Sequence, residues 1–461
     1  MRPAAGASVV FIAACAVLML EILAARMLAP YVGVSLNTYT GIIGVVLAGI
    51  AAGTWVFGQL ADKIDPRRLL APLLIVGGAL AMASAPLVNA LGGHVHSDSL
   101  KAIVALSGAT FFLPAFVLSG VTPVVVKLEL HSLTATGRTV GRLSGVGTFG
   151  ALVGTFGTGF FLTSRLHTHT IALGIGAVLI CLGAAVLWWV SPRRSLPVVA
   201  AVAVAAIAGG VASAQVKSPC TTESAYFCIR VEGAPRIPLL VLDNLPHSSV
   251  QLDHPDQLSF DYARVVAGAI DARWPSHRPL RALHVGGGAF TLPLYLAATR
   301  PGTYSKVLEI DPAVVDIARE RFGLRTGPRV QVKEGDARVS LNAEPLHSYD
   351  VIIGDAFSSR SVPWHLTTKE FLTNLHRRLR PGGAYMMNLI DAGNRFARAE
   401  AATMRAVFRN VVVVPVSHNY VLIGSDRPVA QRGLRGAALD AFIGDAKVLT
   451  DDFAPVDQLL R

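Results

Sequence analysis

The sequence RALHVGGGAFTLPLYLAATRPGTYSKVLEID, residues 281–311, determines how the second half of this chain folds. It begins with an apolar, β-rich run at 281–285, passes through a glycine triplet into a helical stretch at 290–299, and ends in a β-rich run at 306–310. A strand, a helix and a strand in this order form a right-handed crossover between parallel neighbours. The stretch therefore predicts the first unit of a parallel, doubly wound α/β sheet.

The same alternation continues toward the C-terminus. Further β-rich runs stand at 329–333, 349–354 and 384–390, and helical stretches stand at 312–322 and 367–379. Beyond them, VVVVP and NYVLIG are expected to add closing antiparallel strands. The sheet should therefore be mostly parallel, with helices on both faces.

Polar residues and glycines gather at the predicted strand ends, which is where ligands bind in parallel α/β sheets. The first strand leads into Gly286, Gly287 and Gly288, which give a tight turn and let a nucleotide approach the backbone. The second strand ends at Glu309, 23 residues beyond Gly286, where a carboxylate can accept hydrogen bonds from ribose hydroxyls. These two ends predict a nucleotide site.

The next positions extend this prediction. Asp311 either joins the site or caps the following helix. The third strand leads into Gly335, Asp336 and Ala337, where the aspartate could accept a hydrogen bond from an adenine amino group, and the fourth delivers Asp355 to the mouth of the cleft. A glycine triplet alone is also typical of an ordinary turn, but GGG, EID, GDA and D in this order form a specific combination.

Other site classes fit less well. The dinucleotide pattern G-x-G-x-x-G would need glycine where this chain has Thr291. The histidines lack ligand spacing with cysteines or carboxylates, so we expect no metal, and a G-x-S-x-G elbow and a P-loop are absent from the sequence. The net charge of +11 comes without a basic run interleaved with aromatics, so we expect no nucleic-acid partner.

The first half of the chain is far more apolar than the second, and it raises the mean hydropathy of the whole to +0.50. A helix needs about 20 apolar residues to cross a bilayer. Seven stretches qualify, of which the last is Ala-rich and marginal in length: 8–28, 38–60, 69–90, 102–126, 142–163, 169–190 and 197–214. The first carries Glu21 and Arg26, which we expect to form a structural ion pair or to face a polar interior.

These spans divide the chain into three predicted parts. Residues 1–216 form a multi-pass membrane domain of about seven helices, 217–279 a small β segment with a linking helix, and 280–461 the nucleotide-binding α/β domain. The expected partners are the lipid bilayer and a small molecule, and a homodimer stays open.

Loop charges indicate the orientation in the membrane. With a cytoplasmic N-terminus, the inner loops hold eight basic residues and the outer ones three, which favours that orientation. The inner set is Lys63, Arg67, Arg68, Lys127, Arg138, Arg142, Arg193 and Arg194, and the outer set is Arg26, Lys101 and Arg165. Seven spans then place the C-terminal domain outside the cytoplasm, and one miscounted span reverses that side.

Cys220 and Cys228 bear on the same question. The spacing is compatible with a disulfide that closes a small hairpin, which would require an oxidising compartment, and equally with two free thiols in a short β segment. Loop charges and this pair favour an extracytoplasmic domain, whereas supply of a nucleotide made in the cytoplasm favours the opposite side.

The motifs together resemble the spermidine synthase family of polyamine aminopropyltransferases, and its membrane-fused bacterial branch in particular. The resemblance rests on LVLDNLPHSSVQLD, LSFDYAR, HVGGGAFTLP, VLEID, EGDAR and YDVIIGDAFSS between about 240 and 392, and on EILAARMLAPYVG and GQLAD in the first helices. It implies a class I methyltransferase-like (Rossmann-like) fold with a small N-terminal β segment. It also implies transfer of an aminopropyl group from decarboxylated S-adenosylmethionine to putrescine.

The resemblance also implies roles for single residues. The expected nucleotide side is Glu309 at the ribose, Asp336 at the adenine, and Gly286 and Gly288 at the nucleotide backbone. The expected acceptor side is Asp355 at the substrate amine, Tyr262 in the amine region, and Asp243 as the substrate-side aspartate.

The acceptor side departs from the family pattern. Ala289 stands where the family has an aspartate that contacts the aminopropyl ammonium, and Ser358 stands where it has the second aspartate of D-x-x-D. His247 replaces a glutamine in the substrate-binding stretch, and Ala263 and Arg264 follow Tyr262 where the family usually has His-Glu. These changes suggest that the nucleotide is retained and that the acceptor is less basic than putrescine. His247 or Arg264 would face that acceptor, and each could equally be a surface residue or a hydrogen-bonded structural residue.

Three functions follow as alternatives. The first is aminopropyl transfer to an amine, and the second, favoured by Ala289, is methyl transfer from S-adenosylmethionine to a membrane-proximal acceptor. The third is a protein without catalytic activity that binds the nucleotide.

Overall fold

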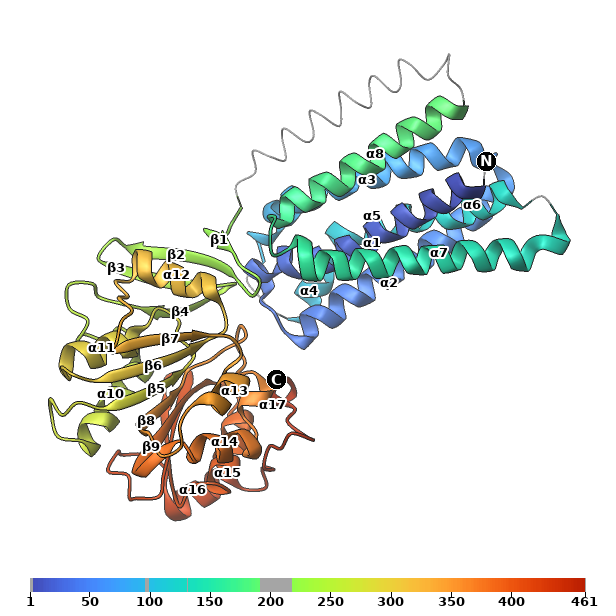
Figure 1. The fold of residues 1–461 in the computed structure, drawn as a ribbon. Coiled ribbons are helices and arrows are strands. Elements are labelled where there is room, and N and C mark those ends of the chain that lie inside the picture. The colour runs from blue at the N-terminus through green and yellow to red at the C-terminus, as the bar shows by residue number, and fades with distance from the viewer. Residues whose placement is uncertain (1–2, 96–98, 131, 191–217, 461) are drawn as a thin grey trace. The chain divides into compact units, whose positions relative to one another are not determined.

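The computed structural model describes residues 3–95, 99–130, 132–190 and 218–460. The chain forms two compact units, Met1–Cys228 and Ile229–Arg461 (Figure 1). The three-part division of the sequence, with boundaries at 216 and 279, stays a prediction.

Six helical segments among the described residues are long and apolar enough to cross a membrane. They are α1 (Pro3–Val32), α2 (Leu36–Lys63), α3 (Pro66–Gly92), the composite segments Leu100–Glu129 and Leu133–Leu162, and α8 (Thr168–Val190). They match the six predicted spans from 8–28 to 169–190, and they are consistent with a multi-pass membrane protein. The seventh predicted span, 197–214, lies outside the described residues.

Two of these segments are interrupted. Leu100–Glu129 consists of α4 (Leu100–Ser107), a π turn η1 (Gly108–Phe112), α5 (Leu113–Ser119) and α6 (Val121–Glu129). Pro114 follows the π turn, and a proline there has no N–H for the ladder and crowds the preceding carbonyls, which a wider turn relieves. The other segment consists of η2 (Leu133–Ala135), α7 (Thr136–Gly157) and a second π turn, η3 (Thr158–Leu162).

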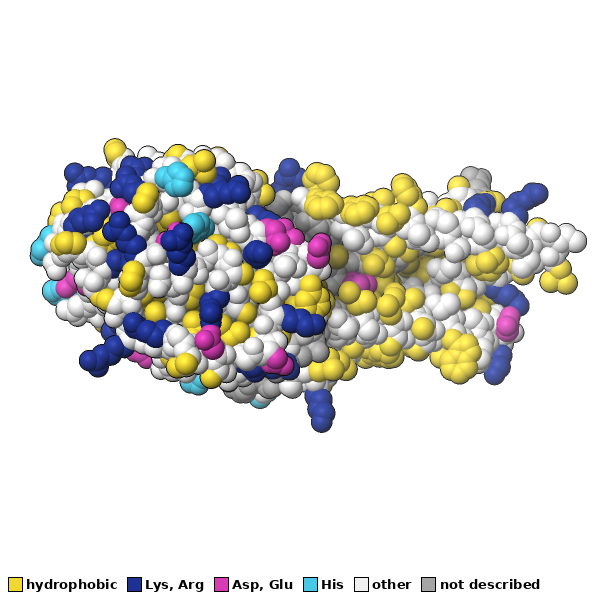
Figure 2. All heavy atoms as spheres, turned by 90° about the horizontal axis from the view of Figure 1, so that it is seen from below, with side chains coloured by type: hydrophobic (Ala, Val, Ile, Leu, Met, Phe, Trp, Pro, Cys, Tyr) yellow, Lys and Arg dark blue, Asp and Glu magenta, His cyan; other side chains and the backbone are white. Residues whose placement is uncertain are grey.

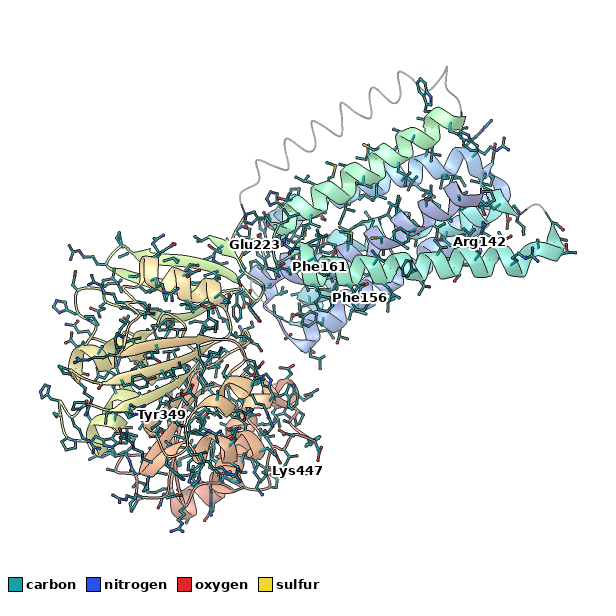
Figure 3. The ribbon with its side chains drawn as sticks, in the orientation of Figure 1. Arg142, Phe156, Phe161, Glu223, Tyr349 and Lys447 are labelled. Carbon is teal, nitrogen blue, oxygen red and sulfur yellow. A yellow bond between two sulfur atoms is a disulfide. The ribbon has the colours of Figure 1, made fainter. Side chains whose placement is uncertain are left out.

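Glycines allow α7 to lie against α1. A Cβ on Gly150 would stand 2.4 Å from the Phe11 carbonyl oxygen, and one on Gly154 would stand 2.4 Å from that of Cys15. Such close backbone contact is a common way for membrane helices to pack. Phe156 and Phe161 project outward from the same segment (Figure 3), with exposed fractions of 54% and 57%, as expected for side chains that face lipid.

The expected Glu21–Arg26 ion pair is not among the salt bridges of the described residues. Residues five positions apart in a helix differ by about 140° in direction around the helix axis. The two side chains therefore point to different sides of α1. The Arg26 guanidinium instead donates to the backbone carbonyls of Ser224 and Ala225. Arg26 therefore holds the short segment that follows residue 217.

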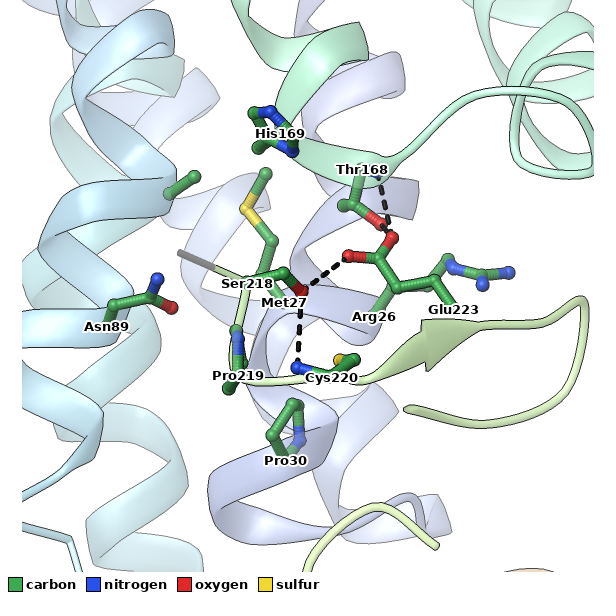
Figure 4. Close-up of a pocket in the computed structure, with 11 residues that line it drawn as sticks. Arg26, Met27, Pro30, Asn89, Thr168, His169, Ser218, Pro219, Cys220 and Glu223 are labelled. Carbon is green, nitrogen blue, oxygen red and sulfur yellow. Dashed lines mark hydrogen bonds between the residues drawn. The ribbon is translucent and has the colours of Figure 1, made fainter. Parts of the chain in front are cut away.

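This segment is closed by a disulfide between Cys220 and Cys228, so the structure decides for the bridge over two free thiols. Glu223, in β1 (Thr222–Glu223), accepts hydrogen bonds from Thr168 N at 2.9 Å and Thr168 Oγ1 at 2.6 Å (Figure 4). Burial acts to raise the pKa of Glu223, but the hydrogen bonds from Thr168 and Ser218 outweigh it, and the pKa lies below its usual value. A carboxylate at the N-terminus of α8 also matches the helix dipole.

The predicted small β segment is confirmed. The strands β2 (Cys228–Ala234), β3 (Ile237–Leu242) and β4 (Leu245–Ser249) are antiparallel neighbours, and β1 completes a four-stranded sheet. The linking helix is α10 (Asp261–Arg273).

The predicted doubly wound sheet is confirmed as well. Its seven strands follow the order β10-β11-β9-β8-β5-β6-β7, in which β5 to β9 are parallel and β10 and β11 antiparallel. The strands are β5 (Arg281–Val285), β6 (Tyr304–Glu309), β7 (Val330–Glu334), β8 (Tyr349–Gly354), β9 (Leu379–Ile390), β10 (Asn410–Val416) and β11 (Asn419–Ser425). The connecting helices are α11 (Thr291–Thr299), α12 (Pro312–Arg321), α13 (Ala337–Ser340), α14 (Lys369–His376) and α15 (Arg395–Arg405), and α16 (Gly436–Ile443) and α17 (Val456–Leu459) follow.

Helices cover both faces of this sheet, because side chains alternate along each strand. On β9, Met386 joins a core under α10 and α11, while Tyr385 and Met387 join a second core under α14 and α15. Lys and Arg side chains are scattered over the surface of this unit, whereas hydrophobic side chains cover the flank of the helical bundle (Figure 2).

Candidate active site

The carboxyl ends of β8, β5, β6 and β7 are neighbours in the sheet, so the predicted site residues share one edge. Gly286, after β5, has φ = +96°, and a Cβ there would stand 2.5 Å from the Asp355 carbonyl oxygen. Gly288 has φ = +51°, and a Cβ there would stand 2.9 Å from Ser248 Oγ. Both positions therefore require glycine, which confirms the tight turn that the triplet predicts.

Glu309, at the end of β6, lies directly beneath this turn. Its Oε2 accepts from Gly287 N at 2.7 Å, and its Oε1 accepts from Asp311 N at 3.0 Å. Burial raises the pKa of Glu309, and these backbone hydrogen bonds act in the opposite direction. Glu309 thus fixes the shape of the glycine turn in addition to the role expected of it.

Asp311 caps α12, where its Oδ1 accepts from Ala313 N at 3.0 Å, and its side chain is 1% exposed. The structure therefore bears out the capping alternative, and a contact with the nucleotide stays a prediction.

Asp336 follows β7 and caps α13, because its Oδ1 accepts from Arg338 N at 2.8 Å and Val339 N at 3.1 Å. Its Oδ2 lies 2.9 Å from His365 Nε2. His365 was not predicted from the sequence, because it lies on the short 3-10 helix η5 (Trp364–Leu366), 29 residues further on, and carries no motif. The neighbouring Ala337 is buried.

Asp355 follows β8 and is held by two donors. Tyr262 Oη donates to Oδ2 at 2.8 Å, and Asn388 Nδ2 donates to Oδ1 at 2.8 Å. Burial raises the pKa of the Asp355 carboxyl to about 6, although both hydrogen bonds lower it. Burial and the neighbouring Asp355 hold the pKa of Tyr262 well above its usual value, so its hydroxyl stays a donor.

Two of the predicted acceptor-side residues, Asp243 and His247, come from the small sheet. Asp243 is 1% exposed and has φ = +55°, in the two-residue turn between β3 and β4. His247 lies on β4, with its ring edge-on to Phe357 at 6.2 Å, so it borders the loop that follows Asp355. Burial lowers the pKa of His247, against the effect of the Leu245 and Ser359 carbonyls, so its ring is neutral at pH 7.

Arg264 and Ala289 are two further positions at which the sequence departs from the family pattern. Arg264 donates to the carbonyl oxygens of Leu258 at 2.7 Å and Ser259 at 3.1 Å and pairs with Asp261, so it fixes the start of α10. Ala289 is fully buried, and its N–H donates to Ser248 Oγ at 2.7 Å. Ser248, which sequence reasoning missed, thereby ties β4 to the glycine turn.

Fold and site define the class of the chain: a Rossmann-like α/β domain that follows a bundle of apolar helices. No family model matches the chain. It is 35% identical over 133 residues to a polyamine aminopropyltransferase of Vibrio vulnificus, covering 28% of this chain and 44% of the relative. It is 28% identical over 181 residues to a polyamine aminopropyltransferase of Neisseria meningitidis, covering 38% of this chain and 66% of the relative.

A second group of relatives consists of proteins named as methyltransferases. The human eEF1A lysine and N-terminal methyltransferase is 28% identical over 141 residues, which cover 28% of this chain and 20% of the relative. Among solved structures, a probable spermidine synthase of Corynebacterium glutamicum matches with a TM-score of 0.46 and 28% identity, covering 52% of this chain and 99% of that one. The chain spans less than two thirds of each of these three curated relatives. The aminopropyltransferase relatives confirm the resemblance to the spermidine synthase family.

Proposed function

We propose that the second unit is a transferase that moves an aminopropyl group from decarboxylated S-adenosylmethionine to an amine acceptor. The observation that carries this proposal is the Asp355 carboxyl. It lies beside the glycine turn, between the Tyr262 hydroxyl and the Asn388 amide, with a pKa of about 6. Such a group is ionised at neutral pH and can take a proton from an amine.

The nucleotide would bind along the edge formed by the strand ends. The turn of residues 286–288 would present backbone without side chains to the nucleotide, because a Cβ on any of these glycines would stand within about 3 Å of neighbouring protein atoms. Glu309 uses one lone pair on each oxygen for a backbone amide, which leaves further lone pairs for ribose hydroxyls. Asp336, with Ala337 beside it, would accept from the adenine amino group through the oxygen that His365 contacts.

The transfer itself needs little from the protein beyond placement and a base. The amine nitrogen attacks the aminopropyl carbon next to sulfur, the C–S bond breaks, and its electron pair returns to the sulfonium, which leaves methylthioadenosine. The extra proton on the amine passes to Asp355, which Tyr262 and Asn388 hold in place. Such placement is the main catalytic contribution when the leaving group is already activated.

Methyl transfer from S-adenosylmethionine is the second candidate, and the surroundings of Ala289 favour it. In place of a carboxylate this position has a buried methyl group, and its N–H is bound to Ser248 Oγ. A cosubstrate with its own carboxylate would therefore meet no repulsion there. Methyltransferase relatives are compatible with this candidate.

We further propose that the second unit lies outside the cytoplasm. The Cys220–Cys228 disulfide belongs in an oxidising compartment. The structure describes the chain up to Val190, at the end of α8, and again from Ser218. Ser218 and Thr168, the first residue of α8, both donate hydrogen bonds to the Glu223 carboxylate. These ends are separated by the length of a helix of 23 residues, roughly 35 Å.

Calorimetry with the full-length protein in detergent tests the binding half of the proposal. Titration with decarboxylated and intact S-adenosylmethionine should show tighter binding of the decarboxylated form. Preference for the intact form would favour methyl transfer, and absence of heat with both would refute a nucleotide site.

A further inference from the structure

A chain of side-chain hydrogen bonds extends from Asp355 across the sheet. Asn388 Nδ2 donates to Asp355 Oδ1 at 2.8 Å, and Asn419 Nδ2 donates to Asn388 Oδ1 at 2.8 Å. The residues come from three elements, because Asp355 follows β8, Asn388 lies on β9 and Asn419 begins β11. Neither asparagine belongs to the motifs that identify the site.

The sheet register sets this contact. Asn388 pairs with Val421 and Asn419 pairs with Ile390 across the antiparallel β9–β11 ladder. The two asparagines are therefore diagonal neighbours on one face, where side chains reach each other. Asn388 is 3% exposed, so water has little access to its amide.

An asparagine amide has a donor end and an acceptor end, and a half-turn about its last bond exchanges them. With the NH2 end toward Asp355, Asn388 supports the ionised carboxylate. In the reverse orientation, its oxygen would repel that carboxylate. Asn419 donates to the Asn388 oxygen and so disfavours the reversal.

On the basis of the proposed function, we propose that Asn419 is a positioning residue. It holds the Asn388 amide with its donor end against Asp355, so that the carboxylate is presented ionised and in a fixed orientation to the substrate amine. Burial raises the pKa of Asp355 and the Asn388 hydrogen bond lowers it, so losing that bond shifts the carboxyl toward its protonated form.

The test is the pH dependence of kcat/KM in Asn419→Ala, measured with the full-length protein in detergent. The acid limb should move up by as much as about one pH unit, because reversal of the Asn388 amide would remove its hydrogen bond to the charged carboxylate, which contributes on the order of 1.5 kcal/mol. KM for the nucleotide should not change. Asn419→Gln, which retains a donor, should restore the limb.

Asn342→Ala is the matched control, because it removes an amide–amide hydrogen bond of 2.9 Å, to Asn374, at an exposed position. An unshifted limb in Asn419→Ala, or an equal shift in the control, would overturn the proposal.

An infrared titration of the Asp355 carboxyl, taken as the difference from Asp355→Asn, needs no turnover. It tests Asn419 even if the wild type fails to use amines, and that failure would count against the proposed function alone. The Asp355 pKa should rise in Asn419→Ala, and an unchanged value would refute the positioning role.

Discussion

Replacing Asp355 with asparagine should abolish turnover and, at the same time, stabilise the fold at neutral pH. The variant keeps the size of the side chain and an oxygen that can accept from Asn388. It removes the base and also a charge that is costly to bury. A residue retained only for structure would not combine a loss of activity with a gain in stability.

The magnitude follows from the pKa of Asp355, which burial raises from 3.8 to about 6. Well below pH 3.8 the carboxyl is protonated in both the folded and the unfolded state, and the wild type incurs no penalty. Between pH 4 and 6 the unfolded chain ionises first, so the folded state binds more protons and stability falls as pH rises. Above pH 6 the penalty is complete, at most about 3 kcal/mol, because the partial exposure of Asp355 screens some of it.

Thermal unfolding of both full-length proteins at pH 4 and pH 8 checks this prediction. The second unit of Asp355→Asn should unfold several degrees higher than wild type at pH 8, and most of the difference should disappear at pH 4. Wild-type kcat/KM should also rise through an acid limb near pH 6. If Asp355→Asn proves less stable than wild type at pH 8, or remains active, the assignment of Asp355 as a buried base is wrong.

Three further predictions concern the nucleotide and the membrane boundary. Glu309→Ala should weaken nucleotide binding about tenfold or more in calorimetry, because two backbone amides and the ribose lose a charged acceptor; the exposed Glu334→Ala at the end of the adjacent strand is the control, and equal losses would remove Glu309 from the site. Reduction of the Cys220–Cys228 bridge, with its sequence separation of 8, should lower the stability of its segment by about 2–3 kcal/mol. A reductant should therefore lower the unfolding temperature of wild type and leave Cys220→Ser unchanged, and an equal response of both would argue against the bridge. On intact cells, an impermeant thiol reagent should label Cys220 and Cys228 after reduction and not before, and absence of label after reduction would place the segment in the cytoplasm.

The parts that could be predicted from the sequence are those with a local pattern. The alternation of β-rich and helical stretches from 281 to 390 predicts the parallel order, and glycines and carboxylates at the strand ends predict the site edge. Lengths of apolar sequence predict the six described spans. Each of these rests on residues close together in the chain, so periodicity and turn chemistry suffice.

The parts that could not be predicted depend on contacts between distant residues. Arg26 binds carbonyls almost 200 residues away, with a separation of 198 to Ser224, and the apparent partner Glu21 is a sequence neighbour on another side of the helix. His365 reaches Asp336 from a short 3-10 helix, and Asn419 reaches Asn388 through the register of an antiparallel pair. Composition does not encode such registers, because many strand pairings would satisfy the same apolar pattern.

The residues of the acceptor side include an example of each kind, one that the sequence could predict and one that it could not. The sequence predicts Tyr262 and Asp355 in one site, and in the structure the Tyr262 hydroxyl donates to Asp355 at 2.8 Å. It left Arg264 open either as a residue that faces the acceptor or as a structural residue, and in the structure Arg264 is bound to the start of its own helix. A charged residue next to a motif is no guide to where its side chain points.

Product analysis tests the central claim most directly. Full-length protein in detergent at pH 8 would receive decarboxylated S-adenosylmethionine with a series of amines that includes putrescine, and intact S-adenosylmethionine in parallel. We predict methylthioadenosine in equal amount with an aminopropylated amine, and loss of both products in Asp355→Asn. Formation of S-adenosylhomocysteine from the intact nucleotide, with no methylthioadenosine from the decarboxylated one, would contradict aminopropyl transfer.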